Sequence, residues 1–77
     1  NINETFKPIG LDYALDYKFI VFNRWGDILF KTDNPQQGWD GKYMGELVEQ
    51  GVYFYRLEFV GSDELRHEES GNIVILR

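Results

Sequence analysis

Two apolar runs joined by a short turn constrain this chain more than any other feature of its sequence. The residues Arg24, Trp25, Gly26 and Asp27 separate an apolar run at 19–22 from a second one at 28–30. Glycine adopts the positive φ that a tight turn requires, so the pattern predicts a β-hairpin. The polar connection that follows carries a second tryptophan, and we expect it to fold back over this hairpin.

Further strands are predicted along the rest of the chain. Side chains alternate between apolar and polar most clearly over Gly51–Val60, and a strong strand is also expected at 17–23. The segment 65–70 is charged and suits an edge strand, whereas 72–76 is apolar and suits a final strand paired within the sheet. A brief strand is expected near 45–48. The sequence therefore predicts an all-β fold, a small antiparallel immunoglobulin-like β-sandwich of six to seven strands.

Large side chains must supply the core, because 77 residues without cysteine contain no disulfide. Six Phe, five Tyr and two Trp are available, and each buried ring removes about 150–250 Å² from water. Trp39 is expected to close one open edge of the sandwich, with its indole N–H bonded to a backbone carbonyl. The residues predicted to be buried are Phe19, Val21, Ile28, Phe30, Trp39, Tyr53, Tyr55, Leu57 and Ile73.

Charge and composition argue against several classes of function. The net charge is −5 and the eight Lys and Arg residues are scattered, so no nucleic-acid partner is expected. No apolar run reaches the roughly 18–20 residues that span a bilayer, so no membrane insertion is expected. His67 is the single histidine, and Ser62 and Ser70 lie in predicted turns without a nucleophile-elbow pattern. We therefore expect no enzymatic activity, no metal site and no cofactor.

One alternative from the residues alone is an accessory or carbohydrate-binding module of a secreted protein. Exposed aromatic rings can stack on sugars, and the candidates are Trp25, Trp39, Tyr43 and Tyr53. Against this, a domain so short needs most of its rings for the core.

Several motifs together resemble a known family, the gliding-motility-associated C-terminal domain. This is the type B sorting domain of Bacteroidota cargo proteins that are exported by the type IX secretion system. The combination of the Asn-Arg-Trp-Gly turn with the Trp-Asp-Gly and Gly-Val-Tyr elements is the most specific part. The resemblance is carried by residues 22–26, Phe30, Trp39, Asp40, Gly41, Gly45, residues 51–55, Gly71 and residues 73–77.

The resemblance implies that residues 1–77 form a single C-terminal sorting domain. Because the chain begins with Asn rather than Met, we expect it to be a piece of a much larger secreted protein. The implied partners are the type IX translocon or outer-membrane attachment proteins, together with the fused upstream cargo. The implied location is secreted or at the cell surface, reached through the periplasm of a Gram-negative bacterium, and the domain is expected to be monomeric.

The resemblance also implies which residues contact the translocon and which have a structural role. Contacts with the translocon are expected from Arg24, Trp25, Gly26, Asp27 and Arg77. The alternative to translocon contact for Arg24 is a structural role, either in a salt bridge or in a position that covers Trp39. A structural role is implied for Asn23, Trp39, Asp40, Gly41, Gly51, Tyr53, Tyr55 and Gly71.

Overall fold

The fold consists of short antiparallel strands joined by tight turns. A computed structural model describes residues 6–8, 10–11 and 14–76. Its strands are β1 (Leu15–Phe22), β2 (Ile28–Thr32), β3 (Lys42–Tyr43), β4 (Glu46–Leu47), β5 (Gly51–Val60) and β6 (Arg66–Ile75). The predicted all-β class and antiparallel pairing are confirmed.

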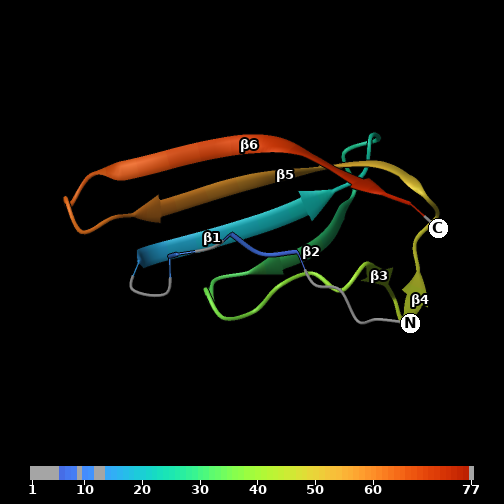
Figure 1. Cartoon of the computed structure of the whole chain (residues 1–77), viewed down its shortest axis with the longest axis horizontal. Coiled ribbons are helices and arrows are strands. Elements are labelled where there is room, and N and C mark those ends of the chain that lie inside the picture. The colour runs from blue at the N-terminus through green and yellow to red at the C-terminus, as the bar shows by residue number, and fades with distance from the viewer. Residues whose placement is uncertain (1–5, 9, 12–13, 77) are drawn as a thin grey trace.

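Four of the strands form one sheet, in the order β2-β1-β5-β6, and β3 and β4 form a separate hairpin. Figure 1 shows the four strands side by side, with the β3–β4 hairpin, the β1–β2 turn and the end of β6 together at one end of the sheet. The β5–β6 turn lies at the opposite end. Loops far apart in the sequence therefore meet at one end of the molecule.

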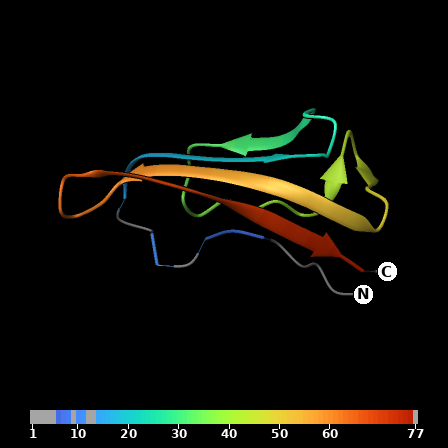
Figure 2. The same cartoon turned by 90° about the horizontal axis from the view of Figure 1, so that it is seen from above.

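The second layer of the sandwich is thin and mostly irregular. The molecule measures 39 × 26 × 19 Å, and packed sheets lie about 10 Å apart, so its shortest dimension holds two layers only. Phe6 and Trp39 exchange two backbone hydrogen bonds, of 2.8 and 2.9 Å, which join the N-terminal segment to the β2–β3 connection. Figure 2 shows the β3–β4 hairpin beside the start of β5. The second layer is thus built from two connections and a small hairpin.

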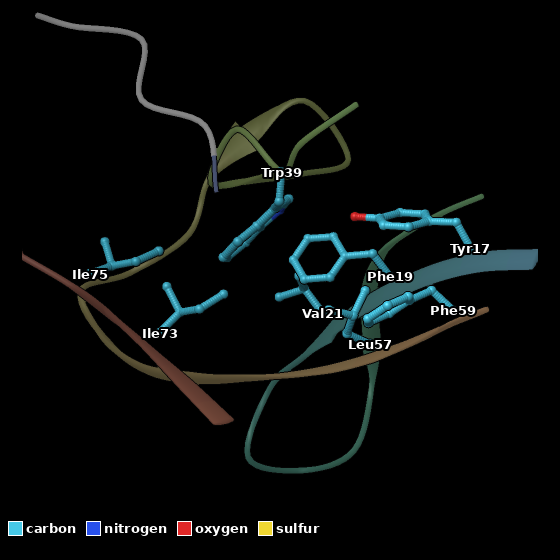
Figure 3. Close-up of a cluster of buried hydrophobic side chains, with 8 residues drawn as sticks. All are labelled: Tyr17, Phe19, Val21, Trp39, Leu57, Phe59, Ile73 and Ile75. Atoms are coloured by element: carbon cyan, nitrogen blue, oxygen red, sulfur yellow. The ribbon is translucent and has the colours of Figure 1, made fainter. Parts of the chain in front are cut away.

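Buried side chains from both layers form one core. β1 contributes alternate residues, as the sequence predicts, and β5 and β6 contribute pairs of their own. Figure 3 shows Trp39 entering this cluster from the second layer, between the β1 rings and the isoleucines of β6. The buried hydrophobic residues are Tyr17, Phe19, Val21, Trp39, Leu57, Phe59, Ile73 and Ile75.

Trp39 is the largest side chain that is completely buried. Its indole Nε1–H donates to the backbone carbonyl of Lys42 at 3.0 Å, which confirms the predicted bond. Its ring centroid lies 6.1 Å from that of Phe6 and 5.6 Å from that of Tyr53. A single side chain therefore joins the N-terminal segment, the β2–β3 connection and β5.

The prediction that Ile28 is buried is wrong, because β2 contains a bulge. Val21 pairs with Phe30, but the next residue, Phe22, pairs with Ile28. Leu29 is therefore left without a partner in the ladder. An extra residue in one strand reverses the face to which the following side chains point. Leu29 packs against the core, and Ile28 is 52% exposed. Of the other predicted core residues, Phe30, Tyr53 and Tyr55 are half-buried.

The C-terminal part of the chain forms a single strand rather than two. β6 pairs with β5 over its whole length, from Val60↔Arg66 to Gly51↔Ile75. The pairing predicted for the final apolar segment is confirmed. The predicted brief strand near 45–48 is β4, and its partner β3 lies in a segment that the sequence analysis treats as a loop.

The β5–β6 turn is held by a carboxylate. Asp63 Oδ1 accepts a hydrogen bond of 3.0 Å from the backbone N–H of Leu65, and Asp63 Oδ2 lies 3.0 Å from His67 Nε2. The His67 ring stacks on Phe59, with centroids 5.0 Å apart. The backbone hydrogen bond and then the His67 contact lower the pKa of Asp63.

Replacement of Trp39 by alanine is expected to come close to unfolding the domain. Removal of a buried aromatic ring costs about 3–5 kcal/mol, and small domains are stable by only about 5–15 kcal/mol. Trp25→Ala is the matched control, since that ring is 74% exposed and its removal is expected to change stability little. Urea unfolding followed by circular dichroism measures both. Equal destabilisation by the two variants would contradict the assigned role of Trp39.

The Asp63 turn is expected to make stability depend on pH. A carboxyl group whose pKa is lowered by folding stabilises the native state above its unfolded pKa and loses this effect as the pH falls through its folded pKa. Asp63→Asn should therefore lower Tm near pH 7. The difference from the native sequence should shrink as the pH falls below about 4, where an ordinary aspartate protonates, and should disappear once the pH is below the lowered pKa of Asp63 in the folded state. Glu64→Gln in the same turn is the control. A difference in Tm that persists at low pH would exclude the ionised carboxylate as the cause.

Candidate recognition surface

The β1–β2 turn is organised by the side chain of Asn23. Its Oδ1 accepts hydrogen bonds from the backbone N–H groups of Trp25, at 2.9 Å, and Asp27, at 3.0 Å. Its Nδ2 donates to Asp27 Oδ2 at 3.2 Å. Gly26 has a φ of 89°, where a side chain would strain the backbone. These contacts give the turn a defined shape although it projects into solvent.

The shape of the turn leaves two large side chains exposed. Trp25 is 74% exposed, and the Arg24 guanidinium carbon lies 4.9 Å from the centroid of the Trp25 ring. The alternative that Arg24 covers Trp39 is wrong, because Trp39 is buried in the core and Arg24 lies over its sequence neighbour instead. Among the described residues, Arg24 forms no salt bridge.

The β3–β4 hairpin lies opposite the β1–β2 turn. Its two-residue loop, Met44 and Gly45, has φ values of 55° and 85°, which are typical of the tight turns that join two antiparallel strands. Tyr43 pairs with Glu46 across the hairpin. At its base, Asp40 Oδ1 accepts a hydrogen bond from the Lys42 N–H at 3.1 Å. The Gly41 carbonyl, next to Asp40, accepts one from Val48 at 3.0 Å.

An open groove of about 430 Å³ lies between the turn and the hairpin. Its aromatic lining includes the 74% exposed Trp25 and the 43% exposed Tyr43. Its charged lining comprises Asp27, Glu46, Glu49 and Arg24. We call this the turn–hairpin groove. Three of the four predicted contact residues at the turn, all except Gly26, lie along it.

The residues assigned a structural role support this end of the sheet. Tyr53 donates its hydroxyl to the Glu49 carbonyl at 2.6 Å, which secures the segment entering β5, and Gly51 pairs with Ile75. Tyr55 packs over Gly71 so closely that a Cβ atom there would lie 2.9 Å from the tyrosine ring. A side chain at position 71 would therefore force the Tyr55 ring to shift.

The four rings suggested as a sugar-binding platform are not all available on one surface, because only Trp25, Tyr43 and Tyr53 line the groove. Trp39 is completely buried, and Tyr53 is half-buried with its hydroxyl bonded to the backbone. Trp25 and Tyr43 remain as exposed rings of that set. This arrangement does not favour the carbohydrate-binding alternative.

Neither a cluster of metal ligands nor a membrane-spanning helix is present in the described part of the chain. Within it, no group of three or more His, Cys, Asp or Glu side chains is placed to hold a metal ion. The same residues include no helix that is long and apolar enough to cross a membrane.

One wall of the groove is not predicted by any sequence motif, and one predicted contact residue lies outside the described part of the chain. Glu46, Leu47 and Glu49 line the groove, yet no motif singled them out. Gly45 indicates a turn in this part of the sequence. It predicts a hairpin only if the two residues of β3 are also recognised as a strand. Arg77 lies outside the described residues, so its predicted contact with the translocon stays a prediction.

The comparisons with known proteins give one match. Residues 1–75 match the family model described as CHU_C Type IX secretion signal domain. Neither the comparison with curated proteins nor that with solved structures gives a match. The family match spans nearly the whole chain, including the turn and both sides of the groove.

Replacement of Asn23 by alanine is expected to loosen the turn that presents Trp25. Loss of two hydrogen bonds to backbone N–H groups should cost about 1–2 kcal/mol. The matched control is Asn72→Ala, at an exposed position on β6. Urea unfolding gives the stability, and ¹⁵N relaxation gives the mobility of residues 24–27. If mobility and stability change no more in Asn23→Ala than in the control, the side chain does not organise the turn.

Proposed function

The chain belongs to the CHU_C type IX secretion signal domain family, and we propose that the secretion system recognises it through the turn–hairpin groove. The domain is a sorting signal that directs an attached cargo protein across the outer membrane by type IX secretion, to the cell surface or the medium. Such a signal works by being bound, and we expect no catalytic role for any of its residues.

The observation that carries the proposal is the exposure of Trp25 on an ordered turn. Trp25 is 74% exposed and lies on the same groove as the exposed Tyr43 and Leu47, and exposed apolar side chains that cluster in this way mark interaction sites. Tryptophan and arginine are also the residues most enriched among those that dominate binding energy. The Asn23 hydrogen bonds fix the backbone from which this ring projects before any partner arrives, which lowers the entropic cost of binding.

The position of the groove supports the same proposal. It lies at the end of the sheet where the β1–β2 turn, the β3–β4 hairpin and the end of β6 converge (Figure 1). Loops gathered at one end of a rigid sheet are where β-sandwich domains usually carry function. The translocon or an outer-membrane attachment protein is the expected partner, met after passage through the periplasm of a Gram-negative bacterium.

Two further expectations concern the extent of the sorting domain and its oligomeric state. We expect residues 1–77 to act as one sorting domain fused to its cargo. A net charge of −5 opposes association between copies, so we expect the domain to be recognised as a monomer.

An export assay tests the recognition surface. The domain is fused behind a signal peptide and a fluorescent reporter in a type IX-competent bacterium, and the reporter in the medium and on the cell surface is measured. Trp25→Ala is expected to reduce export strongly, because loss of a dominant contact costs about 2 kcal/mol, roughly a 30-fold change in affinity.

The control variant is Leu65→Ala, which removes a 61% exposed apolar side chain in the β5–β6 turn at the opposite end of the sheet. Both purified variants should melt within a few degrees of the native sequence, so that a loss of export reports recognition rather than unfolding. Normal export of Trp25→Ala would refute the proposed surface.

A further inference from the structure

The turn–hairpin groove has an unbalanced charge. Asp27, Glu46 and Glu49 contribute three carboxylates, and Arg24 contributes the one guanidinium among the described lining residues. That guanidinium lies over the Trp25 ring, at 4.9 Å from its centroid. The groove is therefore negatively charged at neutral pH.

The carboxylates of Glu46 and Glu49 differ from those on the sheet. On β5 and β6, Glu58 lies 2.8 Å from Arg56 and 3.7 Å from Arg66, and Glu68 lies 3.4 Å from Arg56. By contrast, within the described part of the chain neither Glu46 nor Glu49 forms an ion pair. The domain itself therefore neutralises only part of the negative charge of the groove, through Arg24.

The aromatic walls add a second feature that suits a cation. The faces of tryptophan and tyrosine rings attract Arg and Lys side chains, with tryptophan the strongest. Trp25 already has the Arg24 guanidinium over its ring, and Tyr43 pairs with Glu46 on the opposite wall. Leu47 and Val48 provide apolar lining beside these groups.

We propose that the turn–hairpin groove binds an arginine or lysine side chain, carried by an apolar-flanked segment of the protein that recognises the domain. The carboxylates attract the positive charge, and the faces of the two rings contact the cationic group. The apolar lining contacts the apolar residues that flank the arginine or lysine. Charge complementarity selects this occupant over a second copy, since two copies would bring together chains of −5 charge. This inference rests on the proposed recognition surface and names the chemistry of its partner.

A peptide titration tests the inference on the isolated domain. The probe is acetyl-Leu-Arg-Leu-amide, added to the ¹⁵N-labelled domain at low salt, with the Trp25 indole N–H and the backbone N–H groups of Tyr43 and Glu46 followed by NMR. Saturating shifts at these groups are expected. The same peptide with glutamine in place of arginine should bind at least tenfold more weakly.

Variants test whether the groove carboxylates provide the attraction. The double variant Glu46→Gln/Glu49→Gln should weaken peptide binding at least tenfold. The matched control, Asp33→Asn/Glu64→Gln, removes two exposed carboxylates that do not line the groove and should bind the peptide normally. Equal binding of the arginine and glutamine peptides, or no shift with either, would overturn the proposal. Shifts that depend on protein concentration without peptide would also overturn it, in favour of a second copy.

Export of the same variants separates this inference from the proposed function. Reduced export of Glu46→Gln/Glu49→Gln, with normal melting, supports a cationic partner. If that variant is exported normally while Trp25→Ala is not, the recognition surface stands and the cationic partner is refuted. If Trp25→Ala is exported normally, the recognition surface itself fails, whatever the peptide does.

Discussion

The structure depends on the burial of Trp39. A four-stranded sheet has two faces, and this chain has few residues with which to cover one of them. Trp39 does this by bringing one large ring onto the sheet while its backbone pairs with Phe6 and its indole binds the Lys42 carbonyl. The N-terminal segment, the β2–β3 connection and the β3–β4 hairpin are thereby joined to one face of the sheet. Without cysteine, this packing replaces the disulfides on which many small domains rely.

The position of Trp39 also determines the groove. Its indole bond to Lys42 holds the first residue of β3, and the Gly41 carbonyl receives Val48 directly after β4. The hairpin is therefore held at both ends next to the core. From there it faces the Asn23 turn, so that the stability of the core and the geometry of the recognition surface have the same origin. The carboxylates differ accordingly. Glu58 and Glu68 pair with arginines of β5 and β6, whereas Glu46 and Glu49 in the groove form no ion pair within the described part of the chain.

The differences between the predicted and observed structure have local physical causes. The alternation over 51–60 predicts the faces of β5 correctly, because nothing interrupts that strand. The alternating pattern predicts the wrong face for Ile28 in β2. The reason is the bulge at Leu29, which turns the Ile28 side chain outward. The alternative that places Arg24 over Trp39 fails, because the turn brings the Arg24 side chain back over the ring of Trp25. The groove wall at Glu46 and Glu49 is missed, because a hairpin with two-residue strands is too short to show a periodic pattern.

The sequence by itself determined the features that depend on neighbours along the chain. The alternating strands, the Gly26 turn, the central role of Trp39 and the resemblance to a secretion signal domain all follow from short-range patterns and motifs. Only the tertiary structure decided which loops meet. The pairing of β1 with β5 and of β5 with β6 brings the 23–27 turn and the β3–β4 hairpin to one end of the sheet. Residues about twenty positions apart then form one groove. The sequence suggests Trp25 and Tyr43 as exposed rings, but it does not show that they line one groove or that Glu46 and Glu49 stay without an ion pair among the described residues. These features depend on contacts between segments distant in the chain.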